Sequence, residues 1–126
     1  MRLYRWSSDR GTWVTATPPD RLGANNRYAA AGDGSAKVRF TPRITNPGNY
    51  AVYAWWTAYP NHATNAPYVI RDSAGVHTVL TNQEINGGQW NLLGTYSFAA
   101  GTNGYVELNN AADEYVVADA VMFVSQ

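Results

Sequence analysis

The sequence predicts an all-β fold, a two-sheet antiparallel β-sandwich of the jelly-roll type. Segments rich in Val, Tyr, Trp, Thr and Phe recur along the 126 residues, and turn clusters such as those at residues 46–49 and 86–88 separate them. No stretch carries apolar residues at the three- and four-residue spacing of an amphipathic helix. Chains of many short strands joined by turns usually close as two packed antiparallel sheets.

Nine strands are expected, and residue alternation orients two of them. The strands span residues 12–16, 27–30, 36–41, 49–58, 68–71, 76–81, 92–98, 104–108 and 116–124. Val38 and Phe40 should face the core while Lys37 and Arg39 face water, because successive side chains of a strand point to opposite faces. The strand at 49–58 is bulky on both faces, so it is either central between two layers or carries an aromatic outer surface. Its two faces are Tyr50, Val52, Ala54 and Trp56 on one side and Ala51, Tyr53, Trp55 and Thr57 on the other.

The chain is expected to form one domain over residues 1–126. Its length lies within the usual range of about 100 to 150 residues, and no linker, internal repeat or low-complexity tract interrupts it. The connection at 59–67 is longer than the usual ~4 to 6 residues, and long ordered loops often carry function. Residues 1–13 lack the layout of a signal peptide, so an exported protein would carry its export signal outside this chain.

The charge balance argues against nucleic acid and membrane partners. Nine basic and nine acidic residues give a formal net charge of zero, and the basic residues form no continuous stripe. Binding to nucleic acid or to an anionic membrane depends on a summed positive field, and the longest apolar run is far shorter than the ~18 residues of a spanning helix. A neutral partner is therefore expected, although a local cleft could still bind one anion.

Signals for catalysis are few. The chain has no cysteine, and its only histidines, His62 and His77, are not accompanied by a Gly-x-Ser-x-Gly motif. Asp113 and Glu114 are adjacent in an expected turn, where both carboxylates meet water. The sequence predicts no enzyme, no cofactor and no metal site, although the side-chain oxygens of Asp33 and Asp113 leave calcium open.

Asp119 is an acid expected on an apolar face. Alternation along 115–123 places it among apolar side chains, where an unpaired carboxylate would be costly. It is therefore expected to accept hydrogen bonds from backbone N–H groups or an arginine and to hold the last strand against the beginning of the chain. The alternative is a metal or substrate ligand.

An excess of aromatic residues gives the strongest functional signal. The chain holds five Trp, nine Tyr and three Phe, many beside Asn, Gln or Arg, and flat rings with nearby amides suit a pyranose. The densest cluster spans 55–68, and a second surrounds Trp90. The candidate ligand residues are Trp56 or Tyr59 as stacking platform, Asn61, His62, Asn65 and Arg71 as hydroxyl partners, and Trp90. Core packing is the alternative for each single ring.

Three segments resemble the golvesin or xanthan lyase carbohydrate-binding-like domain family. They are WWTAYPNHATNAPY at 55–68, NGGQWNLLGTY at 86–96 and YVVADAVMF at 115–123, and Trp13 and residues 27–29 and 47–53 also fit. The resemblance covers nearly the whole chain. It implies a non-catalytic β-sandwich appended to larger bacterial proteins, in which Trp90 and Asp119 can be structural.

The resemblance implies an accessory module of a secreted or extracellular protein, which targets a parent enzyme to polysaccharide or cell-surface glycan. The alternative is a structural or self-assembling interaction domain, whose exposed aromatic residues pair with a neighbouring chain. A response to glycans separates the two hypotheses.

Overall fold

The computed structural model describes residues 2–126, which form twelve strands and no helix. The strands are β1 (Arg2–Tyr4), β2 (Ser8–Arg10), β3 (Val14–Ala16), β4 (Asn26–Ala29), β5 (Lys37–Phe40), β6 (Gly48–Trp55), β7 (Ala66–Arg71), β8 (Val76–Thr81), β9 (Asn91–Phe98), β10 (Tyr105–Asn109), β11 (Val116–Ala118) and β12 (Ala120–Ser125). No helix that could span a membrane occurs in this part of the chain.

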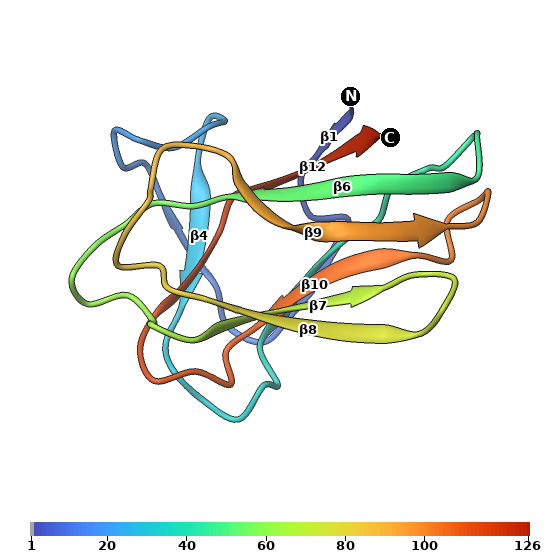
Figure 1. Cartoon of the computed structure of the whole chain (residues 1–126). Helices are drawn as coiled ribbons and strands as arrows, with labels where there is room; N and C mark the ends of the chain where they lie inside the picture. Colours follow the sequence, from blue (N-terminus) through green and yellow to red (C-terminus); the bar gives the residue numbers. More distant parts are fainter. Residues whose placement is uncertain (1) are drawn as a thin grey trace.

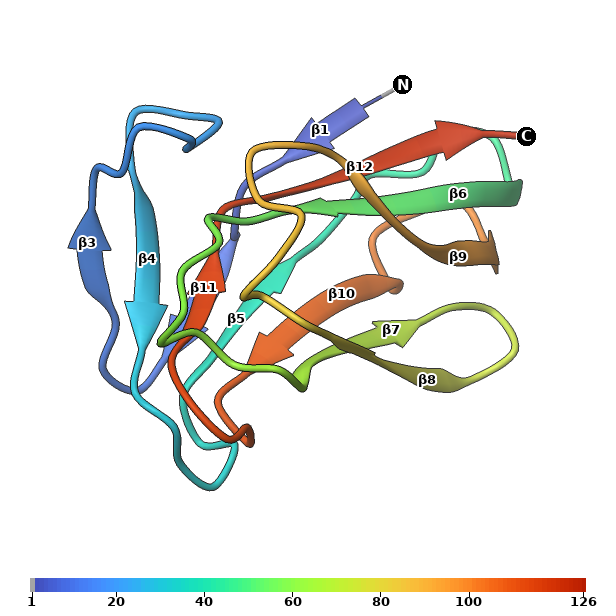
Figure 2. The same cartoon turned by 60° about the vertical axis from the view of Figure 1, so that its left-hand side comes forward.

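Two antiparallel sheets form the sandwich, and a small third sheet stands at one end of it (Figure 1). One layer has the order β1-β12-β6-β9 and the other the order β2-β5-β10-β7-β8. The small sheet, β11-β4-β3, runs steeply across the end of both layers (Figure 2). The predicted antiparallel sandwich is confirmed, and the third sheet is an addition to it.

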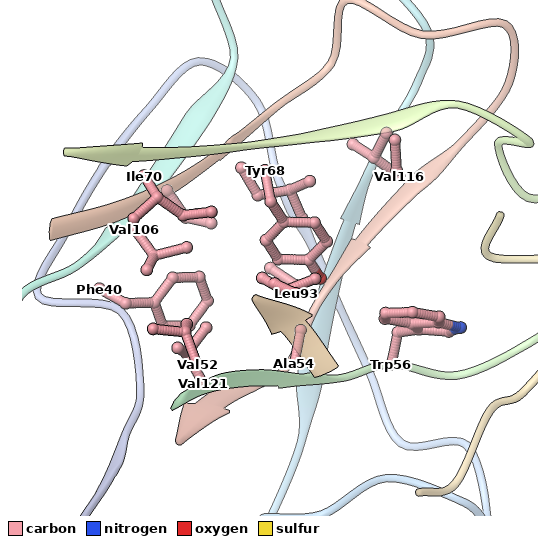
Figure 3. Packing of buried hydrophobic residues seen from close by; sticks show 14 of the residues in the cluster. Phe40, Val52, Ala54, Trp56, Tyr68, Ile70, Leu93, Val106, Val116 and Val121 are labelled. Carbon is pink, nitrogen blue, oxygen red and sulfur yellow. The ribbon is translucent and has the colours of Figure 1, made fainter. Parts of the chain in front are cut away.

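The core lies between the two layers. Val52 and Ala54 of β6, with Trp56 just beyond its end, point toward Tyr68 and Ile70 of β7 (Figure 3). All five side chains are at most 4% exposed, and full burial of a side chain such as Val or Ile contributes about 1.5 to 3 kcal/mol to stability. Of the two faces that alternation separates in the 49–58 strand, the one that carries Val52, Ala54 and Trp56 therefore points into the core.

The alternation predicted for β5 is confirmed as well. Val38 and Phe40 have no exposed surface, whereas Lys37 and Arg39 on the opposite face are partly exposed. This arrangement places the charged side chains of β5 on the outer surface of the five-stranded sheet.

Two strands, β1 and β2, were not predicted. Each has three residues that are mostly exposed, so neither carries an alternating apolar pattern. They are held by pairing with β12 and β5 respectively. Strand ends also differ from the prediction, because β6 stops at Trp55 and β7 already begins at Ala66, which pairs with Thr81.

The predicted strand at 116–124 divides at Asp119. The part before it, β11, pairs with β4 of the small sheet, and the part after it, β12, pairs with β6 and β1 of the sandwich. A single run of apolar residues thus serves two sheets. Alternation alone does not reveal this switch, because all residues of β11 and the first four of β12 are buried on both faces.

The buried amide of Gln83 joins the small sheet to the sandwich. Its Nε2 donates to the Val117 carbonyl at 2.9 Å, and its Oε1 accepts from the Val117 N–H at 2.8 Å, so it binds β11 as a neighbouring strand would. The Gln83 side chain has no exposed surface and also lies 3.3 Å from the Tyr68 hydroxyl in the core. Both backbone groups of Val117 are satisfied in this way.

Replacing Gln83 by leucine should lower the free energy of unfolding by about 2 to 4 kcal/mol, because two buried backbone groups lose their partners. Urea unfolding followed by tryptophan fluorescence measures the change. Gln89→Leu, at an exposed position, is the matched control and should stay within ~0.5 kcal/mol of the parent. Equal effects of the two substitutions would show that the Gln83 bridge is unimportant.

Candidate functional site

A hollow of about 320 Å³ opens where the small sheet meets the segment that follows β6. We call it the tyrosine hollow. Its lining residues are Ala16, Pro18, Asn26, Tyr28, Thr57, Tyr59, Asn61, His62, Tyr115 and Val117. They come from β3, β4, β11 and the 57–62 segment, so the hollow exists only because the third sheet stands beside the sandwich.

Three tyrosine rings give the hollow its character. Tyr28 of β4 and Tyr115, the residue before β11, meet edge to face with ring centroids 5.6 Å apart. Tyr59 makes a similar contact with the His62 ring at 5.6 Å, yet 51% of its surface stays exposed. Tyr59 is therefore the ring with the most accessible face for a ligand to stack on.

His62 fixes the segment that carries Tyr59. Its Nδ1 lies 2.8 Å from the Thr57 carbonyl, and its backbone N–H donates to the Tyr59 carbonyl at 3.0 Å. The next N–H, from Ala63, donates to the Tyr115 carbonyl at 2.7 Å. These bonds close the turn and attach it to the beginning of β11.

Burial lowers the pKa of the His62 imidazole below its ordinary value, although the carbonyls of Thr57 and Gln83 favour the protonated ring. His62 is therefore neutral at neutral pH, with the Nδ1 proton donated to Thr57. Only 8% of the residue is exposed, so its main contribution to the hollow is the position of Tyr59 and Asn61.

A buried polar network holds the floor of the hollow. Asn26 donates through Nδ2 to Thr57 Oγ1 at 2.9 Å, and Thr57 Oγ1 donates to Asp20 Oδ1 at 2.8 Å. Asn26 Nδ2 also lies 3.4 Å from Asp119 Oδ2, which accepts from the Leu22 N–H at 3.0 Å. The network joins β4, the end of β6 and the strand switch.

Asp119 is fully buried, and the backbone N–H and the arginine expected of a structural acid lie beside it, although only Oδ2 of the carboxylate is hydrogen-bonded. A backbone N–H from Leu22 binds Oδ2, and Arg5 Nη1 lies 3.9 Å from Oδ1. Burial raises the pKa of the Asp119 carboxyl above its ordinary value, while the Leu22 amide and the Arg5 charge oppose that rise. The last strand is thereby attached to the beginning of the chain, near Arg5.

Asp33 and Asp113, the two carboxylates considered for calcium, both accept hydrogen bonds from other residues of the chain. Asp33 accepts from Ser35, and Asp113 accepts from the N–H and hydroxyl of Thr64; these bonds lower the pKa of both carboxyls. Within residues 2–126 no group of three or more His, Asp or Glu side chains could hold a metal ion. Neither carboxylate lines the tyrosine hollow, whose polar side chains are amides, hydroxyls and the imidazole of His62.

Three of the predicted ligand residues, Tyr59, Asn61 and His62, line the hollow, and four do not. The stacking role given to Trp56 is corrected, because this ring is 4% exposed within the core and its Nε1 donates to the Ile85 carbonyl at 2.9 Å. Asn65 is outside the hollow and accepts from the Asp113 N–H at 2.9 Å.

Arg71 and Trp90 also lie outside the tyrosine hollow. Arg71 is exposed at the end of β7 in the five-stranded sheet. Trp90 packs edge to face on Trp55 with centroids 5.3 Å apart. Gly87, three residues before Trp90, has a structural role, since a Cβ at this position would lie 2.4 Å from the Ala58 nitrogen.

Tyr28 and Tyr115 are site residues that sequence reasoning missed. They lie far apart in the chain and meet only because β11 pairs with β4, where Val117 is opposite Tyr28. The sequence showed both tyrosines in or beside expected strands, but no pattern indicated that their rings share one hollow.

The hollow carries no charged side chain among its lining residues. Asp20 and Asp119, which are not lining residues, accept hydrogen bonds from Thr57 and Asn26. An environment of aromatic rings with a few fixed polar groups suits an uncharged, hydroxyl-bearing ligand.

Comparisons with known proteins agree along nearly the whole chain. The model of the Golvesin C-terminal domain family matches residues 5–125. The xanthan lyase of Bacillus sp. (strain GL1) is 41% identical over 121 residues, which cover 91% of this chain and 13% of that protein. The chain therefore corresponds to a small part of this much longer relative.

Solved structures share the fold. The structure of Paenibacillus xanthan lyase matches with a TM-score of 0.90 and 44% identity over 94% of this chain and 12% of that one. The GH26-CBM35 β-(1,4)-mannanase of Podospora anserina matches with a TM-score of 0.74 and 13% identity, over 99% of this chain and 27% of that one. A family 35 carbohydrate-binding module from an environmental isolate matches with a TM-score of 0.71 and 16% identity, over 100% of this chain and 94% of that one. The last two likenesses concern the fold alone.

The lowered pKa of His62 gives a pH prediction. In the unfolded chain the pKa of His62 is about 6.5, and above this pH the neutral ring contributes fully to the stability of the fold. As the pH falls below 6.5 the unfolded chain binds a proton before the folded protein does, because the folded pKa is lower. The contribution of His62 to stability is therefore lost as the pH falls toward the folded pKa. The difference in unfolding free energy between the parent and His62→Asn should therefore shrink from pH 7 to pH 5. Chemical denaturation at each pH measures it, and a constant difference would contradict the assignment.

Proposed function

The chain belongs to the Golvesin C-terminal domain family, and on that premise we propose that it is a non-catalytic carbohydrate-binding module of a larger secreted enzyme that acts on polysaccharide. Its 41% identity to part of a xanthan lyase and its fold likeness to a family 35 carbohydrate-binding module support this proposal. The module would hold its parent enzyme on a polysaccharide or a cell-surface glycan.

The tyrosine hollow is the observation that carries the proposal. Its volume of about 320 Å³ lies at the lower end of the ~300 to 1,000 Å³ of small-molecule sites. Tyr59 offers an exposed ring to the apolar face of a pyranose, while Asn61 is exposed at the rim for its hydroxyl groups. Tyr28 and Tyr115 also line the hollow, and a tyrosine hydroxyl can both donate and accept a hydrogen bond.

An uncharged hollow of this size accommodates a short stretch of a neutral glycan. Few contacts are buried in such a site, so we expect a dissociation constant between about 1 mM and 1 μM. Attachment to a parent enzyme that also binds the polymer raises the effective affinity without any new contact. Weak binding by the isolated module is therefore compatible with its role.

Replacing Tyr59 by alanine should weaken binding of neutral glycans at least tenfold, about 1.4 kcal/mol, because the exposed stacking ring is removed. A glycan array identifies the ligand, and isothermal titration of that ligand measures the loss. Asn61→Ala should weaken binding by a smaller factor through loss of a hydroxyl partner.

Asn65→Ala is the matched control, since Asn65 belongs to the same segment but does not line the hollow. It should bind as the parent does, and circular dichroism checks that every variant folds. No response of the folded parent to any glycan, together with defined oligomers in light scattering, would instead favour a structural or self-assembling domain.

A further inference from the structure

A second hollow lies on the outer face of the five-stranded sheet, away from the tyrosine hollow. It has a volume of about 660 Å³ and is lined by Ser8, Asp9 and Arg10 of β2, Lys37 and Arg39 of β5, and Glu107 of β10. The strands that carry it form one continuous layer with β7 and β8 (Figure 2). Its lining is charged where that of the tyrosine hollow is neutral.

Two like charges face each other in this hollow. Arg10 and Lys37 are directly opposite in the antiparallel pair of β2 and β5, an arrangement that destabilises a sheet. No carboxylate pairs with the Arg10 guanidinium among residues 2–126, and Lys37 Nζ lies 4.0 Å from Glu107. An anion bound between Arg10 and Lys37 would relieve their repulsion.

Both carboxylates that line the hollow already have cationic partners. Asp9 pairs with Arg27 of β4. Glu107 accepts from Arg39 Nε at 3.0 Å and from Nη2 at 2.9 Å, in the bidentate geometry of a strong ion pair. Glu107 therefore offsets the charge of Lys37 only in part, because Arg39 shares the same carboxylate, and no carboxylate of residues 2–126 pairs with Arg10.

The positive charge continues across the sheet. The Arg39 guanidinium lies 3.8 Å from the centre of the Tyr105 ring, which fixes its plane on the outer surface. Tyr105 is opposite Arg71 of β7, whose side chain is exposed on the same face. Arg10, Lys37, Arg39 and Arg71 thus form a cationic row that crosses β2, β5 and β7, while β10, between β5 and β7, contributes Tyr105 and the acid Glu107.

The length of the cationic row indicates the kind of ligand. Neighbouring strands are about 4.8 Å apart, so three strand steps separate Arg10 from Arg71 by roughly 14 Å across the sheet. The register also offsets the two residues by four positions along the strands, so the row is a diagonal of roughly 20 Å. A single small anion cannot reach both ends, whereas an extended chain with acidic groups on successive sugar residues can. Arginine binds a carboxylate through two parallel hydrogen bonds.

We propose that the cationic row is a second glycan site, which binds a carboxylate-bearing segment of an acidic polysaccharide. Arg10 and Lys37 hold one carboxylate, and Arg71 holds another further along the chain. The choice of a saccharide as carrier of the carboxylates rests on the proposed function, but the site shares no residue with the tyrosine hollow. The module therefore contacts a neutral and an acidic glycan on separate surfaces.

The test is isothermal titration of the whole chain with oligogalacturonate at low ionic strength. Arg10→Gln combined with Lys37→Gln should weaken binding at least tenfold. Arg2→Gln combined with Arg43→Gln removes the same charge from exposed positions near another small hollow, and this control should change binding less than twofold. Tyr59→Ala should leave the titration unchanged, which separates this site from the tyrosine hollow.

Two results would overturn the proposal. The first is no binding of oligogalacturonate by the folded parent protein. The second is an equal loss in both double variants with equal binding of dextran sulfate, which would identify general attraction of polyanions. Neither result affects the proposed function of the tyrosine hollow, because binding of a neutral glycan there is tested separately by comparing the parent with Tyr59→Ala.

Discussion

The burial of the Asp119 carboxylate at a strand switch is the constraint on which the rest of the structure depends. A strand that leaves one sheet for another interrupts both ladders, and here the Leu22 N–H and the Asn26 amide bind the carboxylate at the break. Asn26 also binds Thr57, so the same network fixes the end of β6. The angle between the small sheet and the sandwich, and with it the tyrosine hollow, follows from these bonds.

The small sheet has too few strands to bury its own surface, and it is stable only against the sandwich. Gln83 supplies the bonds that another strand would give to β11. Tyr28 and Tyr115 of this region line the tyrosine hollow, together with the turn that His62 holds in place. A requirement of folding, the attachment of a narrow sheet, thus creates a concave surface with aromatic walls.

The chain has a formal net charge of zero, yet its charges are unevenly distributed. Several aspartates, among them Asp33, Asp72 and Asp113, serve turns through local hydrogen bonds. Arginines and Lys37 remain on the outer face of the five-stranded sheet, where Glu107 neutralises only part of their charge. A module with one neutral and one cationic surface can hold two chemically different parts of a glycan, and net charge alone conceals this difference.

The sequence by itself determined the all-β class and the inward face of β5, and it favoured a hydrogen-bonded structural role for Asp119, because these follow from alternation and from the cost of burying an unpaired charge. For β6, alternation separated two bulky faces without deciding which one points inward. The sequence also placed Tyr59, Asn61 and His62 in one candidate ligand-binding segment. Only the tertiary structure decided that Trp56 belongs to the core and that Tyr28 and Tyr115 meet beside Tyr59. Alternation assigns a side chain to a face of its strand, but which sheet that strand joins depends on pairing between distant segments, which leaves no local pattern.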